Sequence, residues 1–145
     1  MKPKRALFLL FPLMLAGCGG GGGGSTAPAL TSAPLGVLGG QNIGLTVTPA
    51  GAQVQFACGG SGTISQPLLL DAGGGFDVPG TVLPAQGPPR APILPPPTPI
   101  PARYSGTTDG RTLRLTVTPS DAGLAASTYT LAYGTAPTFS QPCPN

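Results

Sequence analysis

Several residue types that carry enzyme chemistry are missing from this chain of 145 residues, which has no histidine, no tryptophan and no glutamate. Its two lysines, Lys2 and Lys4, both lie near the N-terminus. Without histidine, a Ser–His–Asp or Cys–His arrangement cannot form, and a zinc site lacks its imidazole ligands. We therefore expect no catalytic, metal-binding or cofactor-binding residues, and a protein that is not an enzyme.

Charge is also scarce, because only 8% of the residues are Asp, Glu, Lys or Arg. The formal net charge of +3 comes from Lys2, Lys4 and Arg5, which stand together at the N-terminus. The other charges balance, since four arginines oppose four aspartates. They are Arg90, Arg103, Arg111, Arg114, Asp71, Asp77, Asp109 and Asp121. Such a chain has no basic patch for a phosphate backbone, so we expect no nucleic-acid partner and no electrostatic attraction to anionic lipid.

The first eighteen residues begin with a basic tip, Lys2, Lys4 and Arg5, followed by the short apolar run 6–16. The end of this run overlaps the motif Leu15-Ala16-Gly17-Cys18. A membrane-spanning helix needs about 20 apolar residues, whereas this run is about half as long and contains Pro12. The segment is typical of a signal sequence and not of a transmembrane helix. It resembles the signal peptides of bacterial lipoproteins, in which the last four of these residues form the lipobox. An ordinary secretory signal with a chance cysteine is the alternative.

That resemblance implies that residues 1–17 are a signal peptide that is removed, and that Cys18 receives a diacylglycerol thioether and an N-acyl chain such as palmitate. Membrane lipid would then be a partner of the protein through acylated Cys18. Two or three acyl chains hold a protein firmly on a membrane, whereas one does so only marginally. In the resembling family, an aspartate after the cysteine retains the protein at the inner membrane, but this chain has Gly19 there. The expected location is the cell envelope, at the outer membrane in a Gram-negative organism.

The other two cysteines, Cys58 and Cys143, form an even pair in a chain expected to be exported to an oxidising compartment. A Cys58–Cys143 disulfide bond is our prediction, and two free thiols or an intermolecular bond are the alternatives. In the chain-entropy account, closing a loop of this length stabilises by about 4–5 kcal/mol. The alternation of the preceding residues places Cys58 on the same inward face as Val54 and Phe56.

Composition divides the mature chain into a linker and one domain. Residues 18–40 are rich in Gly, Ala, Pro, Ser and Thr, which is typical of a flexible linker, and residues 41–145 form the domain. From position 41, apolar residues alternate with polar ones, and turn residues separate the runs. The expected runs are 43–48, 53–58, 64–70, 76–78 with a continuation at 81–83, 104–108, 111–118 and 128–133.

This pattern predicts an all-β fold, a small antiparallel β-sandwich or barrel of about seven to eight short strands and no helix, preceded by a disordered N-terminal signal and linker. The order of motifs from Cys58 to Cys143 resembles uncharacterised β-rich domains of other bacterial lipoproteins, which implies a fold type and no site. Leu-Thr-Val-Thr-Pro occurs at Leu45–Pro49 and at Leu115–Pro119, and we interpret it as a recurrent strand ending. Asp109-Gly110 predicts a type I′ turn between two strands.

Residues 84–101 contain nine prolines, which leave few backbone donors for a sheet. We expect a Pro-rich loop with polyproline II character that does not join the β-ladder. Either it is a stiff connection, which we favour, or it is a recognition strip for an aromatic-lined groove.

Asp71 and Asp77 flank a glycine turn, 71–75, and both are most simply turn residues. A glycosidase pair or a calcium site at these two residues is a minor alternative. Our leading functional hypothesis is a lipid-anchored, non-enzymatic binding or structural β module of the cell envelope. The alternative is an accessory or inhibitor protein that presents the Pro-rich loop to an envelope protein partner.

Overall fold

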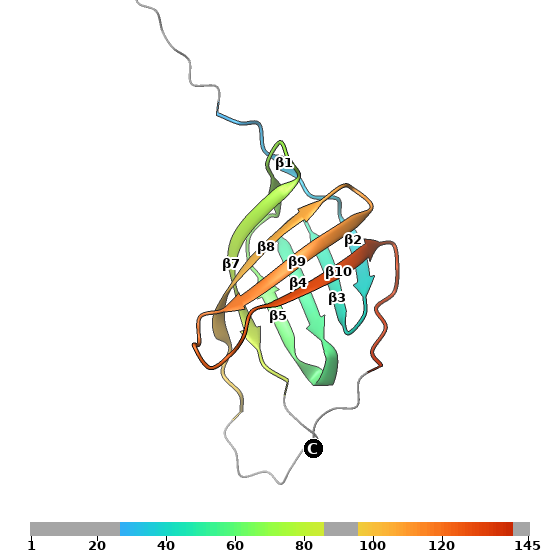
Figure 1. Ribbon diagram of the computed structural model, residues 1–145. Helices are drawn as coiled ribbons and strands as arrows, with labels where there is room; N and C mark the ends of the chain where they lie inside the picture. Colours follow the sequence, from blue (N-terminus) through green and yellow to red (C-terminus); the bar gives the residue numbers. More distant parts are fainter. Residues whose placement is uncertain (1–26, 86–95, 141–145) are drawn as a thin grey trace, which may run out of the picture.

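The computed structural model describes residues 27–85 and 96–140, which form an all-β domain with one short 3-10 turn (Figure 1). Eight strands close into an antiparallel barrel in the order β10-β2-β3-β4-β5-β7-β8-β9, and two short strands pair separately. This confirms the expected all-β fold and the small antiparallel barrel. The strands are β1 (Thr31–Ser32), β2 (Gly36–Gly40), β3 (Ile43–Thr48), β4 (Gly51–Phe56), β5 (Ser61–Ile64), β6 (Leu69–Leu70), β7 (Gly75–Leu83), β8 (Ile100–Thr108), β9 (Thr112–Pro119) and β10 (Ser127–Tyr133), and the 3-10 turn η1 is Ala57–Gly59.

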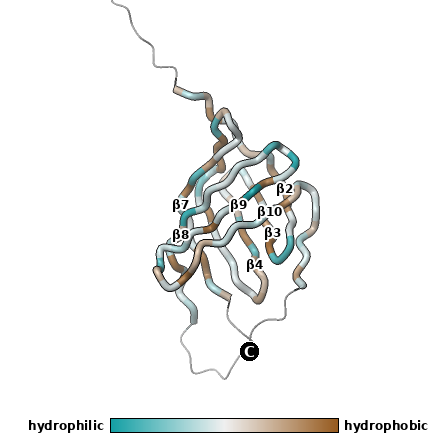
Figure 2. Tube along the Cα trace, viewed as in Figure 1, coloured by the Kyte–Doolittle hydropathy of each residue, from teal (hydrophilic) through white to brown (hydrophobic). Residues whose placement is uncertain are grey.

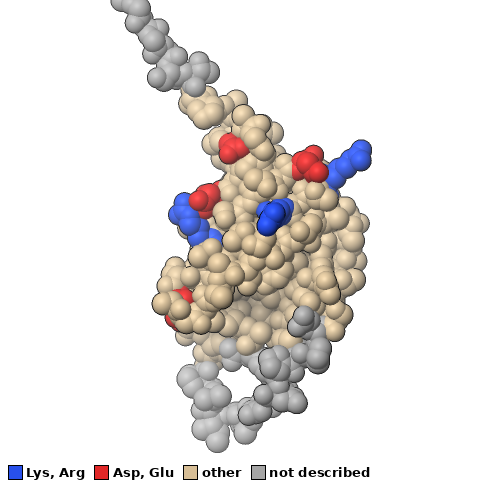
Figure 3. All heavy atoms as spheres, in the orientation of Figure 1, with Lys and Arg blue, Asp and Glu red and all other residues tan. Residues whose placement is uncertain are grey.

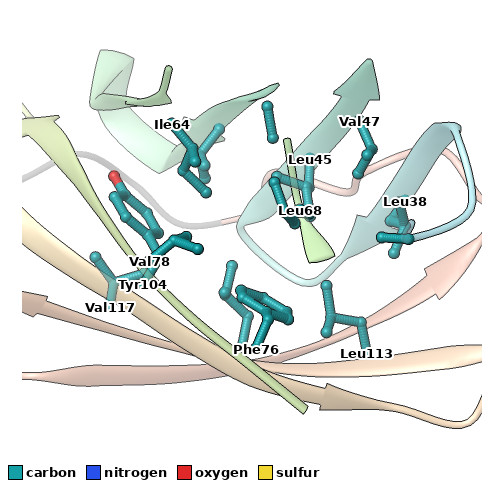
Figure 4. Close-up of a cluster of buried hydrophobic side chains, with 14 of the residues drawn as sticks. Leu38, Leu45, Val47, Ile64, Leu68, Phe76, Val78, Tyr104, Leu113 and Val117 are labelled. Atoms are coloured by element: carbon teal, nitrogen blue, oxygen red, sulfur yellow. The ribbon is translucent and has the colours of Figure 1, made fainter. Parts of the chain in front are cut away.

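Period-two alternation explains the interior of the barrel. Along β3 and β9, leucine and valine point inward and are almost fully buried, while the intervening threonines and arginine point outward. Side chains from opposite walls meet inside the barrel (Figure 4), and hydropathy changes from residue to residue along the strands (Figure 2). Both copies of Leu-Thr-Val-Thr-Pro therefore lie at the end of a strand, as predicted. In each copy the leucine and the valine point inward.

One aromatic ring in the interior occupies space that two glycines leave open. Tyr104 is fully buried, and its hydroxyl donates a hydrogen bond to the Thr81 carbonyl at 2.7 Å. A Cβ atom at Gly62 would lie 2.1 Å from the Tyr104 hydroxyl, and one at Gly80 would lie 2.8 Å from the ring. Glycine at these two positions, on β5 and β7, therefore lets the barrel hold the whole tyrosine ring.

The expected linker 18–40 ends too late. β2 already begins at Gly36, pairs with β3 and β10 to close the barrel, and buries Leu38 completely. Its glycines have a packing reason, since a Cβ at Gly39 would lie 2.3 Å from the carbonyl carbon of Ala136. Gly39 therefore makes room for the C-terminal segment and Gly40 for the backbone of Thr130 on β10, and linker-like composition concealed a barrel strand.

The C-terminal segment after β10 crosses the outer surface of β2 and β3. The ring of Pro137 would lie 3.0 Å from a Cβ at Gly44, the partner of Gly39 in the β2–β3 ladder. The backbone N–H of Asn42 donates to the carbonyl of Thr138 at 2.7 Å, and Thr138 N–H donates to the carbonyl of Gly40 at 3.1 Å. Residues 134–140 therefore form a strap on the barrel wall, here termed the C-terminal strap.

Proline positions also differ from expectation. β7 runs through Pro79 without a break, and β8 includes Pro101, although the 84–101 loop was expected to stay outside any ladder. β5 pairs with β7 only as far as Thr81, and β9 pairs with β8 only as far as Ala102. Each proline therefore has a neighbouring strand on one side only, where a missing N–H costs least.

Two other local predictions need correction. The expected strand 64–70 is two elements, β5 and β6, and β6 leaves the barrel to pair with β1. The β8–β9 hairpin is present, but in its turn only Gly110 has a positive φ angle, so the turn is not type I′. Instead, the Asp109 carboxylate accepts N–H bonds from Arg111 and Thr112 at 2.8 and 2.7 Å.

The two ends of the barrel differ in what they carry (Figure 1). The described chain reaches the barrel at the end with β1, β6 and the turns 71–74 and 109–111, here termed the entry end. At the opposite end, here termed the far end, β7 stops at Leu83 and β8 starts at Ile100. The turn η1 and the loop 120–126 also lie at the far end.

Candidate functional site

Of the three cysteines, Cys58 lies within the described residues, whereas Cys18 and Cys143 do not. Cys58 is disulfide-bonded. It belongs to η1 at the far end, is half-buried and has a φ angle of 62°, so the expected inward strand position is wrong. The chain leaves β4 at Phe56 and turns there, which removes Cys58 from the alternation. Cys58 shares a shallow depression with Phe139 on the C-terminal strap, and its pairing with Cys143 remains a prediction.

The two aspartates of the minor site hypotheses are engaged separately. The Asp71 carboxylate accepts N–H bonds from Gly73 and Gly75 at 2.8 and 2.9 Å, as a turn residue does. Asp77 forms an ion pair with Arg103, with 2.6 Å between Oδ1 and Nε, and both side chains are at least half exposed. Among the described residues no three candidate ligands group together, so nothing in this arrangement favours a calcium site.

The remaining arginines of the described ranges, Arg111 and Arg114, are exposed on the outside of the barrel. Charged side chains gather toward the entry end and over β7–β9 in the face that Figure 3 shows. Both signs are interspersed there, and Arg90 lies outside the described residues. The three arginines of the described ranges, Arg103, Arg111 and Arg114, therefore all lie on an outward face.

A groove of about 690 Å³ runs along the outer wall of β7–β9, beneath the β1–β6 pair. Its outer side is apolar, with Leu30 and Leu69, and its inner side carries Asp77, Ser105 and Arg114. This open, mixed surface, here termed the side groove, has neither a buried polar group nor a set of convergent donors. It does not define a ligand.

A second hollow, here termed the cup, lies at the far end and has a volume of about 390 Å³. Its floor is formed by Val82 and Val117, which belong to the buried interior. Its wall includes the rings of Phe56 and Tyr129, whose centroids are 5.8 Å apart at an angle of 43°. The full lining is Asn42, Phe56, Ala57, Val82, Leu83, Pro84, Ala85, Val117, Pro119, Leu124, Ala125, Ser127 and Tyr129.

The chemistry of the cup is uncharged and mainly apolar. No described residue that lines it carries a charge, and its polar groups are the side chains of Asn42, Ser127 and Tyr129. The Asn42 amide oxygen accepts an N–H bond from Ser140, so that residue is already engaged by the C-terminal strap. Mouths of small β-barrels are common ligand sites, and pockets of this size are usual for small molecules.

The interior next to the cup adds no charge. Tyr104 pairs with Val117 in the β8–β9 register, and burial raises the pKa of Tyr104 to about 12. Its phenol is therefore neutral at physiological pH. The described lining of the cup can therefore hold an uncharged apolar group.

Sequence reasoning did not identify the cup. Its lining comes from four parts of the chain that are far apart in sequence, namely Asn42, the end of β4, the end of β7 and the stretch from the end of β9 to the start of β10. The one local signal is Leu124, an apolar residue 37% exposed in a loop of Ser, Asp, Ala and Gly. Pro84 and Ala85, the first residues of the Pro-rich segment, also line the cup, and residues 86–95 lie outside the described ranges.

Within the described ranges, no helix has the length and hydrophobicity needed to cross a membrane. No protein-family model, curated protein or solved structure matches this chain. Fold and site must therefore be argued from the residues themselves.

Proposed function

We propose that this protein is a lipid-anchored binding module of the bacterial cell envelope. The observation that carries the proposal is the Leu15–Cys18 lipobox, with its basic tip and short apolar run, placed 18 positions before Gly36, where the first strand of a closed β-barrel begins. The signal segment would export the chain, and Cys18 would hold it by its acyl chains. A disulfide-bonded Cys58 agrees with an oxidising compartment.

The barrel would act by binding, and its cup would be the binding surface. The floor of the cup belongs to the buried core, and no described residue that lines it carries a charge. It lies at the far end, whereas the chain from Cys18 arrives at the entry end. A module held by Cys18 would thus turn the cup away from the anchoring bilayer, toward an uncharged apolar group of an envelope partner.

The second candidate is an accessory or inhibitor protein that presents the Pro-rich segment. It gains support from Pro84 and Ala85, because the segment leaves the barrel beside the cup. Deleting residues 86–95 and repeating a capture of partners from envelope extracts separates the two candidates. Unchanged partners would remove the second candidate, and loss of partners with an intact barrel would favour it.

Lipidation is tested by feeding cells tagged palmitate and comparing the protein with its Cys18→Ser variant. We expect the unaltered protein to be labelled and to fractionate with membranes, and the variant to be neither. A labelled, membrane-bound Cys18→Ser protein would overturn the proposal. A Cys58→Ser variant serves as the matched control, since it should keep the label.

Binding at the cup is tested by placing a photocrosslinking amino acid at Leu124 in intact cells. The control is the same amino acid at Gln53, which is exposed on the outer face of β4. We expect an adduct from position 124 that Tyr129→Ala weakens, and none from position 53. Equal adducts at both positions, or an adduct insensitive to Tyr129→Ala, would contradict the assignment of the cup.

A further inference from the structure

We propose that the entry end of the barrel rests on the bilayer through a patch of exposed leucines, so that the domain has a fixed orientation on its membrane. The patch, here termed the leucine patch, consists of Leu30, Leu35 and Leu69. The partner is the lipid surface that holds the protein's own acyl chains. This inference depends on the proposed lipidation of Cys18 and adds a second, weaker contact to it.

The leucine patch is the first observation. The described residues include six exposed large hydrophobic side chains, and Leu30, Leu35 and Leu69 are 57%, 59% and 40% exposed. Leu30 precedes β1, and β1 pairs with β6 so that Ser32 lies opposite Leu69. Ala33 is buried and donates its N–H to the Leu68 carbonyl at 2.8 Å, which holds the chain down just before Leu35. Leu30 and Leu69 form the outer rim of the side groove, and Leu35 stands just before β2, so the three exposed leucines lie at the entry end of the barrel.

The length of the tether is the second observation. Ala27, the first described residue, is nine positions after Cys18. Nine residues span about 30 Å when fully extended, at about 3.3–3.6 Å per residue, and the root-mean-square length of a flexible chain is about 17 Å. The sequence predicted a linker that extends to residue 40. This tether is shorter, so it holds the barrel closer to the lipid than the predicted linker would. A short tether makes contact with the bilayer effectively intramolecular, so a modest apolar patch is sufficient.

Charge at the entry end decides what kind of contact this is. The charged residues of its turns are Asp71, Asp109 and Arg111. Backbone N–H bonds from Thr112 and Arg111 lower the pKa of Asp109, so that this carboxylate stays ionised at neutral pH. Two acidic side chains against one basic one give no attraction to anionic headgroups. The contact is therefore apolar, forms on neutral lipid and does not depend on salt.

The absence of tryptophan provides a clean test. Single tryptophans are introduced as Leu35→Trp and Leu69→Trp, and as the far-end controls Leu124→Trp and Phe139→Trp. The controls replace apolar residues that are also exposed, at 37% and 50%. Each mature, lipidated protein is reconstituted into phosphatidylcholine vesicles with and without brominated acyl chains. We expect strong quenching and a blue shift for the first two proteins, and neither for the controls, at low and at high salt.

Similar quenching at all four positions, or none at any, in protein that floats with the vesicles would overturn the proposal. Quenching that disappears at high salt would also overturn it, because the contact would then be electrostatic. Protein that fails to float indicates a failure of lipidation and not of the leucine patch, so the two proposals are separated by the same preparation. A Leu30→Ser change in the Leu35→Trp protein should reduce the quenching several-fold while the thermal unfolding of the barrel is retained.

Discussion

At the scale of single residues, Tyr104 combines two roles inside the barrel. Its ring fills the space beside Gly62 and Gly80, and its hydroxyl gives the Thr81 carbonyl a partner. Every buried side-chain polar atom of the described ranges has a hydrogen-bond partner. A single polar contact therefore sits in an otherwise apolar interior, where its removal has a measurable cost.

We expect Tyr104→Phe to keep the fold and to lower the free energy of unfolding by about 1–3 kcal/mol, the usual cost of leaving a buried carbonyl without its partner. Urea unfolding followed by circular dichroism measures this. Thr46→Val is a matched control, since Thr46 is exposed on the outer face of β3 and should change stability little. Equal stability of Tyr104→Phe and the unaltered protein would show that the bond contributes nothing net.

The same residue predicts a dependence on alkaline pH. A phenol in an unfolded chain ionises near pH 10, whereas the pKa of Tyr104 is about 12 in the barrel. The folded pKa is the higher one, so this stabilisation is complete below about pH 10 and is lost as pH rises toward about 12. Burial also raises the pKa of Tyr133, although its bond with Thr108 opposes the rise. We expect the stability of Tyr104→Phe to fall less between these pH values, since only the Tyr133 contribution remains.

Inward residues were the most predictable part at this scale. Leu113, Leu115 and Val117 were assigned to one face from alternation alone, and all three are buried. Alternation is reliable because a shift of one residue would expose the whole apolar set. It failed at Cys58, where the chain turns into η1, because period two holds only while the strand continues.

At the scale of elements, the errors concern glycine and proline. β2 was assigned to a linker because three of its five residues are glycine, and two of these glycines are there because another backbone lies against them. β7 and β8 contain Pro79 and Pro101 because each of these prolines pairs with another strand on one side only. Composition shows that glycine and proline are present. Whether they occur in a loop or within a strand depends on neighbouring residues that are distant in sequence.

The contact between β2 and the C-terminal strap leads to a prediction for Gly39→Ala. The new Cβ would lie within 2.5 Å of three backbone atoms of Thr135 and Ala136, so the strap must move. Overpacking of this kind costs about 1–3 kcal/mol. We expect a lower melting temperature and faster hydrogen exchange at Asn42 and Thr138, whose N–H groups hold the strap.

Gly123→Ala is the control for this change. A Cβ at Gly123 would meet only the side chain of Asp121, at 3.4 Å, in an exposed loop. We expect this variant to unfold at nearly the temperature of the unaltered protein. A Gly39→Ala protein as stable as the Gly123→Ala protein would mean that the strap adapts without cost.

At the scale of the whole molecule, the all-β fold class followed from the sequence, and barrel closure did not. Closure depends on β2 meeting β10 through three residue pairs, and β2 was absent from the predicted set. The cup could not be predicted because it forms only when four separate parts of the chain converge at the far end. A surface hollow of this kind depends on which strands lie next to one another, and local sequence patterns do not give that information.

The predicted Cys58–Cys143 bond concerns the whole chain, since it would link η1 to the C-terminus. We expect non-reducing peptide mapping to recover one peptide pair with these two cysteines. Loss of the bond in Cys143→Ser should lower stability by about 2–5 kcal/mol, the usual cost for a small exported domain. Recovery of Cys58 joined to a second molecule would contradict the predicted pairing. A Cys18→Ser change should leave the peptide pair intact.

Closure of the sheet has a consequence for molecules that share a surface. Proteins held in two dimensions meet one another often, and an open row of backbone donors and acceptors invites strand exchange between neighbours. Here each of the eight barrel strands is paired on both sides, and the remaining pair, β1 and β6, is only two residues long. On the membrane that the proposed anchor implies, crowding should therefore leave such molecules separate, without a need for charge repulsion that this nearly neutral domain does not supply.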